Sequence, residues 1–484
     1  MELGKLKKIC GIVLAVYVVI VVVFWLCAKE QLYCRVDSTD RPQENGVIGE
    51  ITSDTVFTQK IKADSNGELM ALELLFATFD RENSCDVTFS VFDGDKLLSS
   101  VSLNAANIKN NDVNTVAFAE PAKLEAGKLY TIEISSANGT PGNALTVYRG
   151  NSYSAGKIDV TLSSAPEMHT FLNGTQQDYF ICWSLITRTE LIWGGIYIYI
   201  ALGIGAVIAG YCAFMIARLK KRKTCLGIKA IIAFTKYRYL LKQLVSRDFK
   251  TKYKRSVLGV LWSFLNPLLM MTVQYVVFST LFKSSIPNYA LYLMIGTVCF
   301  NFFNECTGMC LTSITGNASL ITKVYMPKYI YPVSRSLSSG INMLFALIPL
   351  FGVMLITHVS FTKSLFLLPI PLIMLFAFSL GVGMILASVM VFFRDMQFLW
   401  GVFTSLWSFI TPIFYPTSIW PENYLWFFKS NPLYHILRMM RVILIDGASP
   451  EPKAYIIAAL MSLLTLSVGA AVFKKNQDKF VLNI

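Results

Sequence analysis

The stretch Arg247–Met271 reads RDFKTKYKRSVLGVLWSFLNPLLMM, and it decides the fold class of the chain. Five of its first nine residues are Lys or Arg, and the residues that follow are almost all apolar up to Asn266-Pro267. A basic amphipathic segment that runs directly into an apolar helix is typical of a chain that lies on a membrane surface and then enters the bilayer. We therefore predict a basic linker and interface helix over residues 218–256, followed by a helical membrane core over residues 257–484.

Composition and charge support several membrane spans. The chain has 484 residues, of which 54% are hydrophobic and 15% charged. Residues 29–190 carry a net charge of −9, from 13 basic and 22 acidic side chains, although the whole chain carries +13. Residues 218–255 contain 14 basic residues and a single acid, Asp248. This asymmetry follows the positive-inside rule, so we assign the basic charge to the cytosolic membrane face and not to nucleic acid.

The N-terminal part reads as two further spans around a soluble domain. Three lysines precede the apolar run Ile9–Cys27, which is longer than a typical signal-peptide core and lacks a small-residue cleavage site. We favour an uncleaved first span over residues 1–28 to a cleaved signal peptide. A second span over residues 191–217 returns to the basic linker. Both termini are then cytosolic, and the domain of residues 29–190 lies outside the cell.

Residues 29–190 have the pattern of a β-sandwich. Short segments with alternating polarity, such as Val56–Lys62, Leu69–Phe79 and Asp86–Asp93, are separated by turn sequences, and about nine strands are expected. No CxxC pair and no Cys/His spacing suggests a metal site. The fold class is thus a mostly α-helical polytopic membrane protein of about eight spans, two plus six. An extracellular, jelly-roll-like β-sandwich separates the first two.

Within the core, two regions stand out. Prolines break residues 412–445 into short aromatic-rich helices, with Asn431 as a helix N-cap before Pro432. We interpret these helices as re-entrant, and an aromatic belt at the outer membrane interface explains the same residues equally well. Glu305 lies inside an apolar segment beside Asn301, and an intramembrane carboxylate is a functional candidate. Alternatively, Glu305 reaches water or a lysine at the cytosolic end. No phosphate loop, GxSxG or HExxH motif occurs, so we predict no catalytic residues and no enzyme activity.

Several sequence motifs carry a resemblance over residues 236–484. They are Arg247-Asp248 with Lys252-Tyr253-Lys254, SVLGVLW at 256–262, Asn266-Pro267-Leu268, VFFRD at 391–395, PIFYP at 412–416, and Asn431-Pro432-Leu433 with Arg438. In this order and spacing they resemble the membrane subunit of type-2 ATP-binding-cassette exporters, in the branch that exports teichoic acids, O-antigens and capsular polysaccharides. In that family the subunit begins near the interface helix, so the first two spans and the β-domain are an addition.

The resemblance implies a homodimer in the cytoplasmic membrane, joined to two ATPase subunits that bind ATP and magnesium, with no cofactor in this chain. The substrate would be a polymer on a lipid carrier. The ATPase contacts would lie in residues 236–256 and 318–330, at Arg247, Asp248, Lys252, Tyr253, Lys323, Met326, Pro327 and Lys328. The pathway candidates are Trp262, Asn266, Tyr275, Phe278, Asn301, Glu305, Tyr415, Trp420 and Tyr434.

Other functions remain open from the sequence. An exporter of the same superfamily that moves a drug or peptide would share these motifs. A membrane-anchored ligand sensor or scaffold would use the β-domain, although the cytosolic parts here are only loops and tails. The β-domain itself either contacts the exported glycan or serves as a spacer or a dock for a surface protein.

Overall fold

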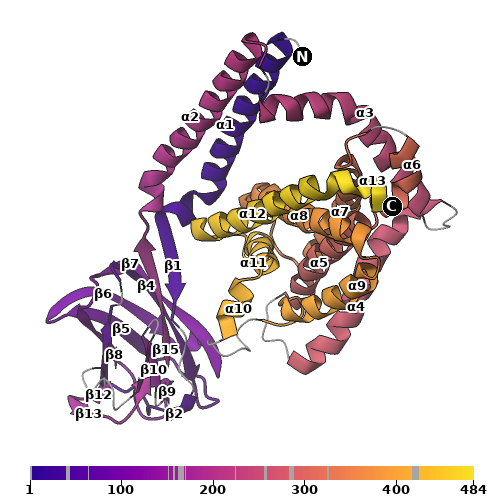
Figure 1. Cartoon of the computed structure of the whole chain (residues 1–484). Coiled ribbons are helices and arrows are strands. Elements are labelled where there is room, and N and C mark those ends of the chain that lie inside the picture. Colours follow the sequence, from indigo (N-terminus) through magenta and orange to yellow (C-terminus); the bar gives the residue numbers. More distant parts are fainter. Residues whose placement is uncertain are drawn as a thin grey trace. The chain divides into compact units, whose positions relative to one another are not determined.

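The computed structural model contains a β-rich unit and a helical unit (Figure 1). It describes residues 3–39, 44–63, 65–108, 110–150, 152–155, 158–161, 168, 170–223, 225–254, 259–282, 288–323, 326–416 and 424–483. One compact unit is formed by Leu32–Gly195, and the other by Met1–Gln31 with Ile196–Ile484. Each unit is described by itself.

The β-rich unit is built from two main antiparallel sheets. One has seven strands, in the order β1-β15-β4-β9-β14, with β7 paired to β4 and β2 paired to β9, and the other has the order β13-β12-β3-β8-β5-β6. The first sheet comprises β1 Cys34–Ser38, β2 Glu44–Val47, β4 Gly67–Ala77, β7 Asp112–Leu124, β9 Thr146–Gly150, β14 Phe180–Ile181 and β15 Trp183–Glu190. The second comprises β3 Val56–Lys62, β5 Asp86–Asp93, β6 Lys96–Asn104, β8 Leu129–Ser136, β12 Thr170–Leu172 and β13 Thr175–Gln176. A separate hairpin joins β10 Ser152–Ala155 to β11 Ile158–Thr161.

The core of this unit lies between the two sheets. Alternate residues of β8 are buried, as expected for a strand with one face toward a core. Phe76 of β4 and Phe89 of β5 are fully buried and meet edge to face, with ring centroids 6.1 Å apart, so they join the sheets directly. Trp183 is also fully buried, and full burial of each of the two Phe side chains stabilises the fold by about 2–3 kcal/mol. The β-sandwich pattern read from the sequence is therefore present as a β-rich region.

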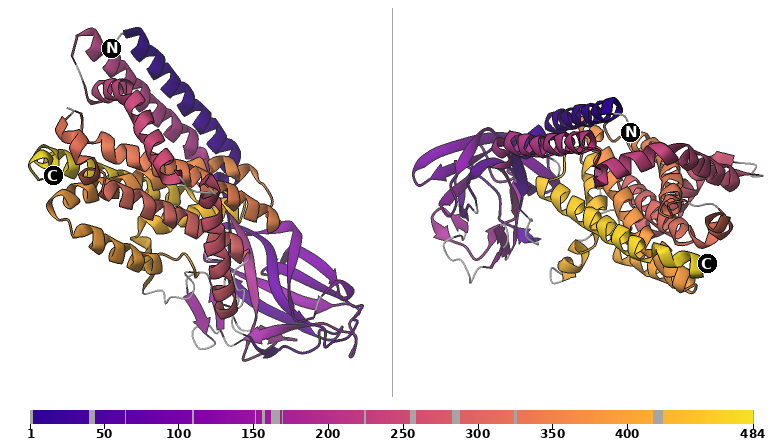
Figure 2. Two further views of the ribbon diagram at one scale, coloured as in Figure 1. Left: turned by 90° about the vertical axis from the view of Figure 1, so that its right-hand side faces the viewer. Right: turned by 45° about the horizontal axis from the view of Figure 1, so that its top comes forward.

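The helical unit begins with two long helices that run side by side. They are α1 Leu3–Tyr33 and α2 Trp193–Lys220, and both views in Figure 2 show them adjacent. Within the unit, the Tyr17 hydroxyl donates to the Ala201 carbonyl at 2.6 Å, and the Tyr197 hydroxyl donates to the Val21 carbonyl at 2.8 Å. Many other side chains of α1 and α2 are apolar and exposed, and they form a surface that lipid would cover.

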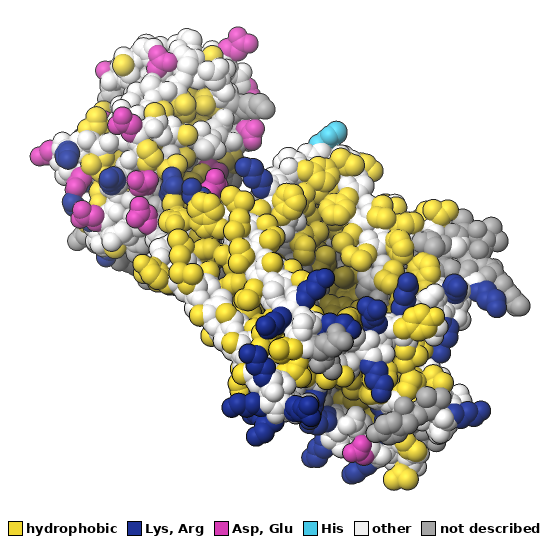
Figure 3. Space-filling model, turned by 90° about the horizontal axis from the view of Figure 1, so that it is seen from above, with side chains coloured by type: hydrophobic (Ala, Val, Ile, Leu, Met, Phe, Trp, Pro, Cys, Tyr) yellow, Lys and Arg dark blue, Asp and Glu magenta, His cyan; other side chains and the backbone are white. Residues whose placement is uncertain are grey.

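The remaining helices form the bundle that positions the candidate site. They are α3 Leu226–Tyr253, α4 Trp262–Phe282, α5 Tyr289–Leu311, α6 Ala318–Lys323, α7 Ile330–Ile356, α8 Pro369–Phe392, α9 Met396–Ile410, α10 Leu425–Lys429, α11 Pro432–Leu444, α12 Pro452–Asn476 and α13 Phe480–Asn483. Among the described residues, five helices are long and apolar enough to cross a membrane, and two shorter apolar helices accompany them. The chain is thus a mostly helical, multi-pass membrane protein with a β-rich region. Hydrophobic side chains cover much of the helical surface in Figure 3, whereas acidic side chains gather on the rounded β-rich unit.

Glycines set the closest helix approach in the bundle. A Cβ added at Gly381 of α8 would lie 2.6 Å from the backbone nitrogen of Leu466 in α12, and one at Gly469 would collide with the Gly381 backbone. Small residues at such crossings let two backbones meet, which is a common way to pack membrane helices. At the C-terminal side of the bundle, Asn431 caps α11 by accepting a hydrogen bond from the Leu433 amide, with Pro432 in the first turn. This cap confirms the prediction from the sequence.

Candidate functional site

One stripe along α3 faces the bundle and changes from apolar to charged. Leu241 and Leu244 are buried against Ile330 at the start of α7. Asp248 and Lys252 continue the same stripe at helical spacing, so they also point toward the bundle. The interface helix therefore presents two charged side chains, one turn apart, to the helices behind it.

Asp248 is the centre of the first charged contact. Its side chain is only 5% exposed, and its Oδ1 accepts from Arg335 of α7 at 3.1 Å and from Arg247 at 3.2 Å. The Ser338 hydroxyl donates to the other carboxylate oxygen at 3.3 Å. A buried carboxylate is tolerated when cations and hydrogen-bond donors surround it in this way. Asp248 thus connects α3 to α7.

Arg247 extends this contact to the loop after α5. Its guanidinium also donates to the Asn317 amide oxygen at 3.2 Å, and the Asn317 amide nitrogen donates to the Ser313 carbonyl at 2.8 Å. Asn317 is buried and ends the short 3-10 turn Thr315–Asn317 that leads into α6. Arg247 therefore links α3 to the start of the loop that is predicted to contact the ATPase.

Lys252 makes the second contact, with Glu305. Its Nζ lies 2.6 Å from Glu305 Oε1, and the Asn342 amide donates to the same oxygen at 2.7 Å. Since Lys252 belongs to α3, Glu305 to α5 and Asn342 to α7, three helices meet at this carboxylate. The Lys252 and Glu305 side chains are 45% and 30% exposed, so this pair is only partly buried by the chain itself.

Two cavities adjoin these contacts and share Lys252, Glu305 and Asn342 in their walls. The first, of about 470 Å³, contains Arg247, Asp248, Asn317 and Arg335. The second, of about 540 Å³, lies between α4, α5 and α7 and is rich in amides. Its polar lining comprises Lys252, Asn266, Gln274, Thr297, Asn301, Asn304, Glu305 and Asn342, with Trp262 and Phe302 among the apolar residues. Four of the nine predicted pathway residues, Trp262, Asn266, Asn301 and Glu305, are thus together in one cavity.

Pro267 helps to explain the polarity of the second cavity. It lies inside α4, where it cannot donate a backbone hydrogen bond, and it lines this cavity next to Asn266. Irregular or polar groups within a membrane helix are tolerated where they face a cavity. Further along α4, Gln274 accepts a hydrogen bond from the Thr297 hydroxyl at 3.0 Å. The cavity therefore offers amide donors and acceptors, one exposed indole and, in its wall, the Lys252–Glu305 ion pair.

An aromatic cluster lies toward the C-terminal end of α4. The rings of Phe278 and Phe414 stack at 5.3 Å, and those of Tyr275 and Tyr289 are 6.2 Å apart. The Tyr292 hydroxyl donates to the Tyr415 carbonyl at 2.8 Å, which fixes the chain after α9 against α5.

Arg441 of α11 completes this aromatic cluster. Its guanidinium lies over the Tyr292 ring, 3.4 Å from the centroid, and donates to the Ile413 carbonyl at 3.1 Å. A cation on an aromatic face is worth about 2 kcal/mol when desolvated. The cluster therefore unites α4, α5, α11 and the segment after α9.

The other predicted residues lie in different places. Tyr434 packs edge to face on the neighbouring His435 ring, and Lys323 is exposed at the end of α6. Lys328 donates to the Gln477 carbonyl at 2.5 Å and is therefore joined to the C-terminal segment. Met326 and Pro327 are half-buried. Trp420 lies outside the described residues, and of Tyr253 only the backbone is described.

Sequence reasoning missed Arg335, Ser338 and Asn342, all on α7. They are the residues that hold Asp248 and Glu305. A signal was present, because Ser334, Ser338 and Asn342 recur every four residues and so share one face of a predicted membrane helix. Arg441 was missed as well. An arginine in a hydrophobic stretch is energetically costly to place in a membrane, so its presence indicates a specific partner or role.

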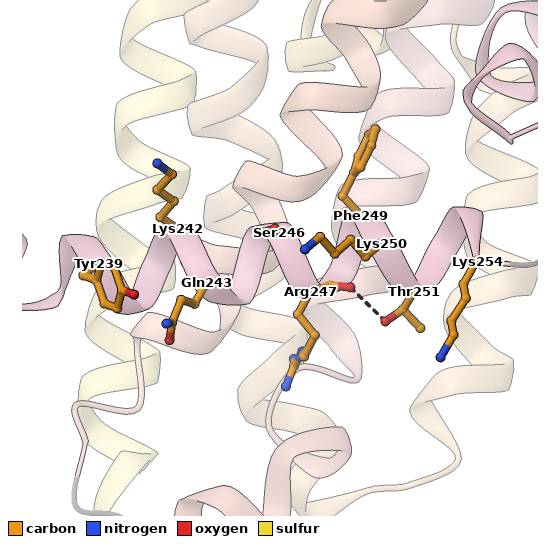
Figure 4. Close-up of a pocket in the computed structure, with 9 residues that line it drawn as sticks. All are labelled: Tyr239, Lys242, Gln243, Ser246, Arg247, Phe249, Lys250, Thr251 and Lys254. Carbon is orange, nitrogen blue, oxygen red and sulfur yellow. Dashed lines mark hydrogen bonds between the residues drawn. The ribbon is translucent and has the colours of Figure 1, made fainter.

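The side of α3 that faces away from the bundle forms an open basic groove of about 1020 Å³. Its lining residues are Tyr239, Lys242, Gln243, Ser246, Arg247, Phe249, Lys250, Thr251 and Lys254. Figure 4 shows Gln243, Arg247 and Lys254 on one side of the helix, while Lys242 and Phe249 point to the other. The groove contains four cations and no carboxylate, which favours an acidic protein surface or anionic headgroups as its partner.

Comparison with known proteins places this bundle in a family. Residues 239–445 match the family model described as ABC-2 type transporter. An O-antigen export system permease protein, RfbA, of Klebsiella pneumoniae is 31% identical over 244 residues, which cover 50% of this chain and 93% of the relative. The chain belongs to the ABC-2 transporter membrane family.

Two further relatives of this ABC-2 protein are also described as polysaccharide export or transport proteins. The O-antigen export system permease protein RfbA of Myxococcus xanthus is 28% identical over 260 residues, covering 53% of this chain and all of the relative. The polysialic acid transport protein KpsM of Escherichia coli is 25% identical over 244 residues, covering 49% of this chain and 93% of that protein. The family model covers the bundle from within α3 to the end of α11, and each relative matches about half of the chain, so the resemblance to polysaccharide-export membrane subunits is confirmed. These relatives are transport permeases, and the family normally pairs with a separate ABC ATPase.

Proposed function

We propose that this chain is the membrane subunit of an ATP-driven exporter that moves a lipid-linked cell-surface polysaccharide, or a teichoic-acid-like polymer, across the cytoplasmic membrane. The observation that carries the proposal is the match of the bundle to O-antigen and polysialic acid export proteins. The amide-lined cavity supports it, because amide groups can donate and accept hydrogen bonds with sugar hydroxyls. Trp262, which is exposed in that cavity, adds an aromatic face.

The polar contacts suggest how a partner drives the bundle. An ATPase that binds the basic groove of α3 would move Asp248 and Lys252. Asp248 is ion-paired with α7, and Lys252 is ion-paired with α5. In this scheme the two contacts transmit the movement to the walls of the polar cavity. ATP and magnesium are bound by the partner, and two copies of this chain form the pathway. Both termini face the cytosol.

The β-rich unit would then lie outside the cell, where we propose that it contacts the exported glycan. Its net negative charge agrees with a location away from the basic cytosolic linker. Isolated Leu32–Gly195, which is one compact unit, can be titrated with the host's own surface polymer. Saturable binding at or below millimolar concentration is expected, and the absence of binding there would remove the glycan role without affecting the export proposal.

The export proposal is tested in inverted membrane vesicles that contain this chain and its co-expressed ATPase. We expect lipid-linked polymer, added outside, to become protected from glycosidase only when ATP is present. A Lys252→Glu variant of the same vesicles should hydrolyse ATP but protect much less polymer. Protection that does not depend on ATP, or that persists in vesicles without this chain, would contradict the proposal.

A further inference from the structure

A second groove on α3 shares Lys242, Ser246 and Phe249 with the basic groove, but its other lining residues are apolar except for Arg238. It has a volume of about 570 Å³ and lies between α3 and α7. From α3 it is lined by Phe234, Leu241, Val245 and Phe249, and from α7 by Leu337, Ile341 and Phe345. Each set recurs at helical spacing, so each forms a stripe and the groove is the space between two stripes.

The base of the groove is firmly packed and its side is open. Leu241 is buried, whereas Phe234 is 66% exposed and Leu337 is 37% exposed. At one end the Phe249 and Phe345 rings lie 5.9 Å apart, and Phe345 also meets Phe264 of α4 edge to face at 6.0 Å. The groove is therefore a preformed apolar channel that opens sideways and is closed by aromatic rings at one end.

Two cations stand at the rim of this groove. Arg238 and Lys242 line it, are one helical turn apart and are exposed. Within the part of the chain that the structure describes, neither has an ion-pair or hydrogen-bond partner, and no carboxylate lines the groove. An apolar channel with two unpaired cations at its rim matches a molecule with a hydrocarbon chain and an anionic head.

We propose that this groove binds an anionic glycerophospholipid of the surrounding bilayer, with an acyl chain along the two stripes and the phosphate at Arg238 and Lys242. A basic amphipathic helix lies at headgroup level, which places such a rim where phosphates are abundant. The groove shares no lining residue with the amide-lined cavity, so its occupant is separate from the transported polymer. The bound lipid would fill the space between α3 and α7 and thereby set the resting position of the interface helix.

The test uses the purified full chain in nanodiscs that contain a phosphatidylglycerol probe with a photoactivatable group in its acyl chain. We expect crosslinks on the α3 and α7 peptides, and far fewer with a phosphatidylcholine probe of the same chain. Since each cation near a headgroup contributes about 1 kcal/mol, which is about fivefold in binding, the Arg238→Ala/Lys242→Ala variant should be labelled about thirtyfold less. Ile341→Trp, which fills the groove and keeps both cations, should also reduce labelling.

The matched control is Lys250→Ala/Lys254→Ala, which removes the same charge at the same spacing from positions that do not line this groove. Its labelling should equal that of the unmodified chain. Equal loss in both double variants, or equal labelling by the two headgroups, would overturn the proposal. Displacement of the probe by polyprenyl phosphate, at concentrations where unlabelled phosphatidylglycerol has no effect, would instead assign the groove to the lipid carrier and also overturn it. Size-exclusion profiles identify any variant that fails to fold.

Discussion

Lys252 of the interface helix lies 2.6 Å from Glu305 of α5, and Asn342 of α7 holds the same carboxylate oxygen. The sequence left two interpretations of Glu305 open, a functional carboxylate or a residue that reaches a lysine. The structure provides the lysine, and that lysine belongs to the helix expected to meet the ATPase. The two interpretations therefore become one proposal, in which the ion pair connects the motor-facing helix to the pathway wall.

Charge exchange tests this connection. Lys252→Glu should lower polymer export severalfold, because it places two carboxylates together, and Glu305→Lys should do the same. The Lys252→Glu/Glu305→Lys double variant restores the pair and should recover most of the export, with a coupling energy of about 1 kcal/mol for a partly exposed pair. Export is measured as surface polymer per unit of membrane-inserted protein. Additive losses in the double variant would mean that the two residues act independently.

Asp248 and Arg247 should differ in their effect on stability. Asp248→Ala removes a buried carboxylate and leaves Arg335, which is 24% exposed, without its ion-pair partner, so a loss of about 2–3 kcal/mol in unfolding free energy is expected. Arg247→Ala removes a cation that is 47% exposed, and the loss should stay below about 1 kcal/mol. Thermal unfolding of the detergent-solubilised chain gives both values. Equal losses would argue against Asp248 as the buried centre of the contact.

The helix crossing at Gly469 gives a packing test. Gly469→Val would force α12 away from the Gly381 backbone, and overpacking of this kind costs about 1–3 kcal/mol or more. The matched variant is Gly352→Val in α7, where an added Cβ meets nothing within 4 Å. We expect Gly469→Val to lower the folded yield in fluorescence-detected size exclusion and Gly352→Val to leave it unchanged. The reverse order would show that α8 and α12 do not meet at these glycines.

Acid should weaken one contact in the β-rich unit. The Arg81 guanidinium, 2.6 Å from Glu50, lowers the pKa of that carboxyl, and the Gly142 amide also donates to it. Because the folded pKa lies below the unfolded value of about 4.3, the contribution is complete above that pH and is lost as pH falls through the folded pKa. Both side chains are well solvated, so the contribution should be about 0.5 kcal/mol. Unfolding of Leu32–Gly195 should distinguish Glu50→Gln from the unmodified unit at pH 7 and not at pH 2.

Local patterns explain what the sequence predicted well. Alternating polarity placed strands at Val56–Lys62 and Asp86–Asp93, and these are β3 and β5 in the structure. The Asn-Pro cap at Asn431 was equally local. These features depend on the periodicity of apolar side chains and on turn residues within a few positions, and both can be read from one sequence.

Contacts between residues far apart in the sequence could not be predicted from such local patterns. Arg335 meets Asp248 across 87 positions of sequence, and nothing in either segment identifies the other. α3 also begins at Leu226, early in the segment 218–256 that was predicted as a linker followed by a helix, because its first turns pack Ile228 with α1 and α2. Tertiary packing extends a helix whose own sequence is only weakly amphipathic at that end.

The central claim is that this chain exports a surface polysaccharide, and the most direct measurement is the location of that polymer in cells that lack the chain. Fractionation of a deletion strain, with glycan staining of each fraction, should find lipid-linked polymer accumulated inside the cytoplasmic membrane and little at the surface. The unmodified gene should restore the surface polymer, and the Lys252→Glu gene should restore severalfold less of it. Unchanged surface polymer in the deletion strain, with no accumulation inside, would contradict the account.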